Sequence, residues 1–273
     1  MSVSVAMIPY TNMAPYRQLG PPEGCRFVPL VPRASVAALM AGEVAAAAVP
    51  VGGLHRLTGI VEPLGRFGIA AKGACMSVLL FSRCPATQLC ARNTLRLTDE
   101  SASSVRLLYL LLGNACGFDR LPRLAGEGQA PDAELLIGDR ALVRGAAAGQ
   151  NDDAAYVTDL SQMWYEHYGL PFVFARWVVR KDAPQQLKAG LRSWLQRFRA
   201  EEETLVAQAI PQAAKRLALA PELVQRYFKV IRRCLDDSDM AGQQQFLGQI
   251  ERFGREPFFP APAATPQTKA GDP

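Results

Sequence analysis

The sequence predicts an α/β fold in two lobes that enclose a ligand cleft. Short apolar runs alternate with helix-like segments through the first eighty residues, and a similar alternation restarts after Cys84-Pro85. Polar residues also stand at the ends of four apolar runs. The 273 residues suffice for one large domain or two lobes of ordinary size. About half of them are apolar and a fifth are charged, which is typical of a globular protein.

The first eighty residues supply the elements of one α/β lobe. Short β-prone runs occupy residues 3–8, 25–31, 45–54, 61–71 and 75–82. A helix is predicted over 35–44, with Ser35 as its N-cap and Gly42 at its end. The run at 75–82 is apolar enough to be buried on both faces. This order of strand, helix and strand predicts a largely parallel sheet.

The second lobe is expected to begin near Cys84-Pro85. Its elements are a short strand and a helix within 95–113, a strand and helix start at 134–143, a helix at 154–169 and a β-prone run at 169–181. If residues 77–82 and 172–179 cross between the lobes, the second lobe is inserted into the first. The predicted division is 1–82 plus 176–260 for the first lobe, 83–175 for the second, and 261–273 as a disordered tail.

Beyond residue 183 the chain reads as helical. Apolar residues recur every three or four positions and predict one buried face made of Leu187, Leu191, Trp194, Leu195 and Phe198. A second amphipathic helix is expected to begin at Pro221. The mixed-sign runs 180–188 and 230–237 are typical of solvated helix faces.

Charge and cysteine usage narrow the class of function. The net charge of +5, without a dense basic run, fits a small anionic ligand at least as well as nucleic acid, and no basic aromatic motif supports nucleic-acid binding. Six cysteines without a CxxC pair, and only two histidines, predict reduced thiols and no metal site. No nucleotide loop or familiar hydrolase motif is present, so no cofactor is expected. Without a leader peptide or a long apolar run, we expect a cytoplasmic protein that makes no membrane contact.

Two of the polar strand ends fall in the first lobe. Tyr10, Thr11 and Asn12 follow the first strand, and an asparagine amide binds a hydroxyl or carboxylate without adding charge. The alternative is an Asx-turn before Pro15. Ser77 heads the run at 77–82, where a serine either contacts a ligand or satisfies nearby backbone groups.

The other two fall in the second lobe. Ser103 and Ser104 stand at a helix start, where free N–H groups and the helix dipole favour an anion, although capping alone explains such serines too. Gly138 and Asp139 follow an apolar strand, where glycine lets a ligand approach the backbone. A tight turn with Asp139 as N-cap is the alternative. Together the four strand ends predict a cleft that closes on a small anion.

Six segments in order resemble the chorismate dehydratase family of the futalosine route to menaquinone. They are IPYTNMAPYRQL, GEVAAAAVPVGGL, GIAAKGACMSVLLFSR, ESASSVRLLYLLL, ELLIGDRALV and DLSQMWYEHYGLPFVFARWVVRK. The resemblance runs from about residue 3 to residue 182, with a looser helical part afterwards. It implies a periplasmic-binding-protein-like fold of the second type, with two α/β lobes around a central cleft and a helical C-terminal segment.

The resemblance also implies an activity, the conversion of chorismate to 3-[(1-carboxyvinyl)oxy]benzoate and water. Carried onto this chain, Asn12 would bind substrate and orient the leaving hydroxyl or a carboxylate, with Tyr10 beside it. Ser77 would bind one carboxylate, while Ser103 and Ser104 would bind the other. Gly138 and Asp139 would close the far wall, and Asp139 is one candidate for the base.

Several alternatives stay open at this point. A carboxylate of chorismate itself is the second candidate for the base, and Arg33, Arg83 and Arg140 are candidates to pair with substrate carboxylates. The sequence is also similar to the neighbouring 1,4-dihydroxy-6-naphthoate synthase family, although YTNMAP favours the dehydratase. A non-catalytic binding protein or sensor would use the same cleft. Either a monomer or a homodimer is compatible with the sequence.

Overall fold

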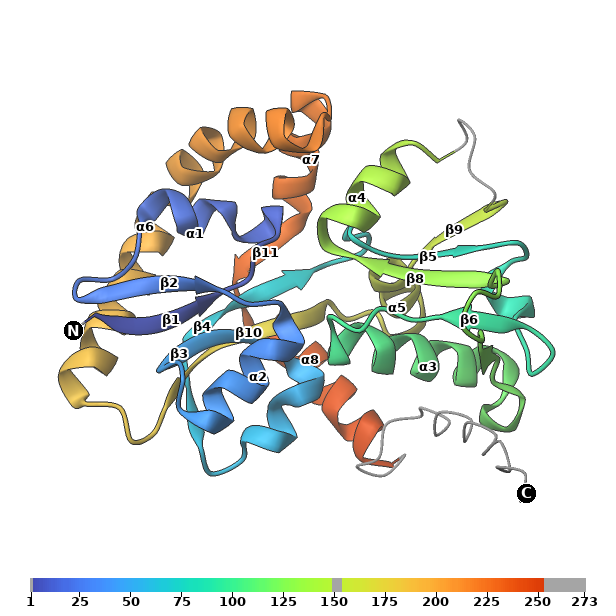
Figure 1. The fold of residues 1–273 in the computed structure, drawn as a ribbon, viewed down its shortest axis with the longest axis horizontal. Helices are drawn as coiled ribbons and strands as arrows, with labels where there is room; N and C mark the ends of the chain where they lie inside the picture. Colours follow the sequence, from blue (N-terminus) through green and yellow to red (C-terminus); the bar gives the residue numbers. More distant parts are fainter. Residues whose placement is uncertain (1, 149–153, 253–273) are drawn as a thin grey trace, which may run out of the picture.

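A computed structural model describes residues 2–148 and 154–252 of the chain. The tail predicted at 261–273 lies outside the described residues. Figure 1 shows two sheets placed side by side along the long axis of the molecule, each flanked by helices. The expected α/β architecture with two lobes is confirmed.

The first sheet has six strands in the order β11-β4-β10-β3-β1-β2. Their bounds are β1 Val3–Met7, β2 Cys25–Pro29, β3 Ala46–Pro50, β4 Val61–Ala71, β10 Phe172–Arg180 and β11 Ile231–Cys234. Only the β1–β2 and β1–β3 pairs are parallel, and β10 and β4 pair with their neighbours antiparallel. The prediction of a largely parallel sheet was therefore wrong, because β10 returns from the second sheet and enters between β3 and β4 in the opposite direction.

The second sheet has five strands in the order β7-β6-β8-β5-β9. Their bounds are β5 Val78–Ser82, β6 Thr94–Arg96, β7 Arg123–Leu124, β8 Ala133–Ile137 and β9 Tyr156–Asp159. β5 lies between β8 and β9, so the strand that we expected in the first lobe belongs to the second sheet. β9 was not predicted, because its four residues were read as the beginning of the helix that follows. The predicted division assigned the first residues of β10 to the second lobe. In the structure β10 belongs to the first sheet along its whole length.

Eight α-helices and four short 3₁₀ helices connect the strands in the described parts of the chain. The α-helices are α1 Ala14–Leu19, α2 Pro32–Ala41, α3 Ala102–Cys116, α4 Gly138–Ala146, α5 Leu160–Tyr168, α6 Gln185–Leu217, α7 Pro221–Val230 and α8 Asp237–Arg252. The 3₁₀ helices are η1 Thr11–Met13, η2 Val51–Leu57, η3 Ala86–Gln88 and η4 Phe118–Arg120.

The helix α2 begins earlier than predicted. Pro32 is its first residue and Val31 precedes it in an extended conformation, so Ser35 lies inside the helix and donates its hydroxyl to Val31 O. Proline is favoured at the first helical position, because its missing N–H would have no partner there. Gly42 ends the helix in the left-handed conformation, as predicted.

Alternating residues of the first sheet face two different helix layers. Ala6, Ala47 and Val178 pack with α2, while Val5, Ala48 and Trp177 belong to the main core on the other face. That second face is covered by α1 and α6 (Figure 1). The predicted face of α6 is confirmed, since the side chains of Leu191, Trp194, Leu195 and Phe198 are all buried there.

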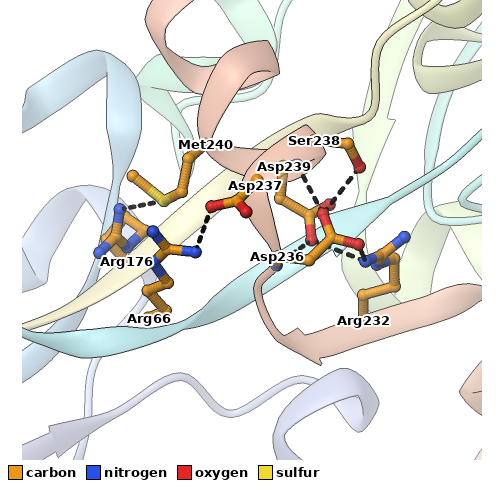
Figure 2. Close-up of polar contacts among 8 residues, drawn as sticks. All are labelled: Arg66, Arg176, Arg232, Asp236, Asp237, Ser238, Asp239 and Met240. Atoms are coloured by element: carbon orange, nitrogen blue, oxygen red, sulfur yellow. Dashed lines mark hydrogen bonds and ion pairs between the residues drawn. The ribbon is translucent and has the colours of Figure 1, made fainter.

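Polar contacts fix the start of α8 against the first sheet (Figure 2). Asp239 is fully buried, accepts the Asp236 N–H at 2.9 Å and pairs with Arg232 of β11 at 2.9 Å. The buried guanidinium of Arg176 on β10 contacts Met240 Sδ at 3.1 Å, and burial lowers the pKa of this arginine. These contacts hold β11 at the edge of β4, where it reaches the space between the two sheets.

Candidate active site

The pocket between the two sheets, hereafter the central pocket, is lined by residues from both of them. The lining consists of Ile8, Tyr10, Asn12, Pro32, Pro50, Ile69, Ser77, Val78, Ser101, Ser104, Ile137, Gly138, Phe174, Ala175 and Ile231. Five of the seven predicted site residues therefore share one pocket. Ser103 and Asp139 do not contribute to its lining.

The central pocket is contracted. Its volume of about 40 Å³ holds a few water molecules. Pockets for small organic ligands usually measure about 300–1,000 Å³. The pocket in this structure is therefore too small for such a ligand, a state that resembles the closed form of two-lobed proteins that close on a ligand.

Asn12 presents an unused acceptor to the central pocket. It sits in the 3₁₀ helix η1, directly after β1, and its Oδ1 is buried without a hydrogen-bond partner among the described residues. No local N–H reaches this oxygen, so the structure does not contain the Asx-turn that was the alternative. A buried amide oxygen without a partner costs free energy, which a ligand hydroxyl or a bound water would recover.

A buried arginine holds the backbone of Asn12 in place. Arg233 of β11 is 1 % exposed and donates from Nε to Asn12 O at 3.0 Å. Its Nη1 donates to Ile231 O at 3.1 Å and pairs with Glu202 at 3.3 Å. Sequence reasoning missed this residue, because the run 230–237 was read as a solvated helix face, whereas residues 231–234 form a strand beside the pocket.

Ser77 contacts a buried residue of α7. Tyr227 of α7 donates its hydroxyl to Ser77 Oγ at 3.1 Å, and burial raises the pKa of Tyr227. Just before Ser77, the main-chain N–H groups of Cys75 and Met76 donate to Asp159 at 2.9 and 2.7 Å. Asp159 also caps α5, so it fixes the loop that delivers Ser77 to the pocket.

The serines before α3 have separate roles. Ser101 is the N-cap and accepts the Ser104 N–H at 3.2 Å, and the hydroxyls of Ser101 and Ser104 lie 3.1 Å apart at the pocket wall. Ser103 points the other way, where its Oγ accepts the Gly52 N–H at 2.9 Å and donates to Phe174 O at 3.1 Å. Ser103 therefore joins α3 to η2 and β10, a position at odds with the predicted substrate contact.

We expect Ser103→Ala to lower the free energy of unfolding by about 1–3 kcal/mol, because the Gly52 N–H loses a buried acceptor. Urea unfolding of the variant and of Ser2→Ala, an exposed serine near the start of the chain, measures this difference. Reduced ligand affinity with unchanged stability would instead favour direct contact between Ser103 and the ligand.

Gly138 lets the two sheets approach closely. Its φ of +59° is unfavourable for residues with a side chain, and an added Cβ would lie 2.8 Å from the ring of Tyr10. The Gly138 N–H donates to Ser77 O at 2.8 Å. A glycine is thus needed where β8 ends and α4 begins, because the aromatic side chain from the opposite lobe packs directly on the backbone.

Asp139 connects the lobes instead of lining the pocket. Its Oδ1 accepts the Thr11 N–H at 2.8 Å and its Oδ2 pairs with Arg216 of α6 at 2.7 Å. Arg216 also donates to Thr11 Oγ1. We call Thr11, Asp139 and Arg216 the latch. Its contacts join α4 on the second sheet to η1 and α6 on the first.

Comparison with known proteins places the chain in a family. A family model described as menaquinone biosynthesis matches residues 3–252. The chain belongs to the menaquinone-biosynthesis family. A curated relative from Thermus thermophilus, named chorismate dehydratase, is 34 % identical over 271 residues, which cover 92 % of this chain and 96 % of the relative. The predicted family resemblance is confirmed.

Solved structures confirm the fold predicted for this family member. Protein AF1704 from Archaeoglobus fulgidus matches with a TM-score of 0.65 at 16 % identity and covers 93 % of this chain and 98 % of its own. The periplasmic aliphatic sulphonate binding protein SsuA from Escherichia coli matches with a TM-score of 0.60 at 15 % identity, covering 94 % and 95 %. The second match supports a periplasmic-binding-protein-like fold.

The central pocket of this family member has mostly apolar walls with a few uncharged polar groups. Among the described residues no arginine or lysine lines it, and its polar groups are hydroxyls, one amide and main-chain atoms. Burial and, to a smaller extent, the nearby Glu100 carboxylate raise the pKa of Tyr10, so Tyr10 stays neutral.

None of the three arginines that the sequence offered as partners of substrate carboxylates lines the central pocket. Arg83 pairs with Asp132 at 3.9 Å, Arg140 is exposed on α4, and Arg33 borders a different pocket.

The described residues contain no group of three or more histidine, cysteine, aspartate or glutamate side chains arranged to hold a metal ion. Within the same parts of the chain, none of the helices combines the length and apolar character that a membrane span requires.

Proposed function

We propose that the chain is a chorismate dehydratase, which converts chorismate to 3-[(1-carboxyvinyl)oxy]benzoate and water. The observation that carries this proposal is the 34 % identity to a protein of that name over nearly the full length of both chains. The family description, menaquinone biosynthesis, agrees with a reaction that feeds that pathway. The lyase class follows from the reaction proposed.

The reaction removes a proton and a hydroxyl from neighbouring ring carbons. The C–H bond at the carbon bearing the enolpyruvyl ether breaks, and its electron pair forms the new ring double bond. The adjacent C–O bond breaks, and the departing hydroxyl takes a proton and leaves as water. Because the ring becomes aromatic, the protein mainly needs to position the substrate and stabilise developing charge.

The residues of the central pocket suit such positioning. Asn12 offers a buried amide whose oxygen has no protein partner among the described residues, and it would hold the leaving hydroxyl or a carboxylate. Ser77 and Ser104 offer hydroxyls from the second lobe, and Tyr10 and Gly138 form the wall between them. A closed pocket also excludes bulk water, which strengthens each of these hydrogen bonds.

We further propose that a carboxylate of chorismate itself takes the ring proton. Asp139, the other candidate, has both carboxylate oxygens engaged by Thr11 and Arg216 and lies outside the pocket lining. An intramolecular carboxylate is delivered with the substrate, so no side-chain base is required in the pocket.

Two alternatives use the same pocket. A 1,4-dihydroxy-6-naphthoate synthase would share the description of the family, and the name of the curated relative favours the dehydratase over it. A sensor that binds without turnover is supported only by the fold, which SsuA shares.

Purified protein incubated with chorismate tests the proposal. We expect the mass of one water to be lost and the ultraviolet spectrum of a substituted benzoate to appear. Tight chorismate binding without loss of water would support the sensor, and neither binding nor turnover would leave the dehydratase assignment without support.

A further inference from the structure

A second pocket borders the central pocket and differs from it in charge. It lies between α2 and η2 on one side and residues 98–106 at the start of α3 on the other, elements that adjoin near the middle of Figure 1. Ser101 lines both pockets. Pro32 lines the central pocket and its neighbour Arg33 lines the second, so the two spaces are separated by little more than one layer of residues. We call the second space the outer pocket.

Three arginines contribute to the outer pocket and no carboxylate does. They are Arg33 of α2, Arg56 of η2 and Arg106 of α3. In the described parts of the chain no salt bridge involves any of the three, and the one side-chain hydrogen bond among them runs from Arg106 to Ala102 O at 3.4 Å. Burial and the charges of Arg33 and Arg56 lower the pKa of Arg106. Arg33 and Arg56 are exposed and Arg106 is half-buried, so water screens part of the repulsion among these like charges, and a bound anion would relieve the rest.

The outer pocket is much larger than the central pocket. Its volume is about 330 Å³, against about 40 Å³ for the central pocket. The first turn of α3 also leaves main-chain N–H groups without partners inside the helix, which adds a favourable potential for an anion. An anionic molecule that meets the closed protein therefore finds an accessible cationic cavity directly beside the closed one.

We propose that the arginines of the outer pocket form a capture site for a dicarboxylate, the substrate dianion on its way to the central pocket. This inference rests on the proposed function for the identity of the ligand. The central pocket has no cationic side chain in its lining, so long-range attraction of a dianion must come from elsewhere. Arg33 and Arg56 belong to elements beside the first sheet and Arg106 to α3 beside the second, so a bound carboxylate would also draw the lobes together.

A binding experiment tests the site without turnover. Benzene-1,3-dicarboxylate, an unreactive dianion, is titrated calorimetrically into wild type, Arg56→Gln/Arg106→Gln and Arg123→Gln, an exposed arginine on β7. Asn12→Ala, which removes a proposed contact of the central pocket, is titrated as well, to separate the two pockets. We expect the double variant to bind at least about tenfold more weakly than wild type, Arg123→Gln to bind as wild type does, and Asn12→Ala to bind more tightly than the double variant. Equal affinity in the double variant and wild type, or a loss of affinity in Asn12→Ala as large as that in the double variant, would overturn the site.

Steady-state kinetics test whether chorismate is the ligand of the outer pocket. We expect KM for chorismate to rise about tenfold in the double variant with kcat little changed, and the fall of kcat/KM between low and high salt to become shallower. Weaker dicarboxylate binding with unchanged KM and salt dependence would overturn the substrate as the ligand. If wild type shows no turnover, the proposed function fails, while the calorimetric result still decides whether the outer pocket is an anion site.

Discussion

Asn12→Ala is expected to fold and to lose chorismate turnover by at least about 100-fold, the effect of removing one well-placed hydrogen-bonding group from a transition state. The side chain makes no hydrogen bond through Oδ1 to described residues, so its removal costs the folded state little. The contact that Arg233 makes is to the main-chain carbonyl of residue 12, which the substitution leaves in place. Turnover by mass spectrometry and stability by urea unfolding measure the two quantities separately.

A matched control for this variant is Gln18→Ala, which removes an amide on α1 that bonds to Gln212 at 3.0 Å outside the central pocket. We expect Gln18→Ala to keep normal turnover. If Asn12→Ala also turns over normally, Asn12 has no role in the reaction and η1 serves only as the connection between β1 and α1.

The second large effect is expected at the latch. Asp139→Ala removes two charge-assisted hydrogen bonds between the lobes, each worth about 1.5–3 kcal/mol. Because the central pocket is lined by residues of both lobes, weaker contact between the lobes is expected to lower the fraction of competent protein. We expect kcat/KM for chorismate to fall by about 30-fold or more, with the overall stability of each lobe little changed.

A double-mutant cycle separates the latch from a catalytic base. If the latch explains the effect, Arg216→Gln causes a large loss by itself and adds little to Asp139→Ala, since both break the same contact. Asp139→Asn, whose one amide oxygen can accept from either Thr11 or Arg216 but not replace both carboxylate oxygens, then retains part of the activity. Complete loss of turnover in Asp139→Asn, with product binding retained, would identify Asp139 as the base. Arg197→Gln, which breaks an exposed pair within α6, serves as the control.

The strand and helix order could be predicted from sequence because the signals are local. The apolar runs at 3–8, 25–31 and 61–71 are strands, and the apolar spacing after residue 183 gave the buried face of α6. β9 was not predicted for a physical reason, since a strand of four residues directly before an amphipathic helix leaves no separate periodicity. The direction of β10 depends on the return from the other lobe, which local residues do not encode.

The polar strand ends located the pocket but not the role of each residue. The hydroxyl of Ser103 binds Gly52, 51 positions away, and Asp139 binds Thr11, 128 positions away. Such partners are known only once the lobes are placed together. Sequence reasoning missed Arg233 for a similar reason, because nothing in the neighbouring sequence distinguishes a buried arginine from a solvated one.

The contacts of Arg216, Tyr227 and Arg233 with the first half of the chain have a consequence for the order of synthesis. A growing chain that has reached Arg180 contains strands β1–β10, and so both sheets except for the edge strand β11. It still lacks Arg216, which pairs with Asp139, Tyr227, which donates to Ser77, and Arg233, which holds Asn12. It also lacks α6, whose buried side chains cover one face of the first sheet. Since chains fold from the N-terminus as they leave the ribosome, the complete first lobe and the contacts that close the pocket arrive together with the last helices.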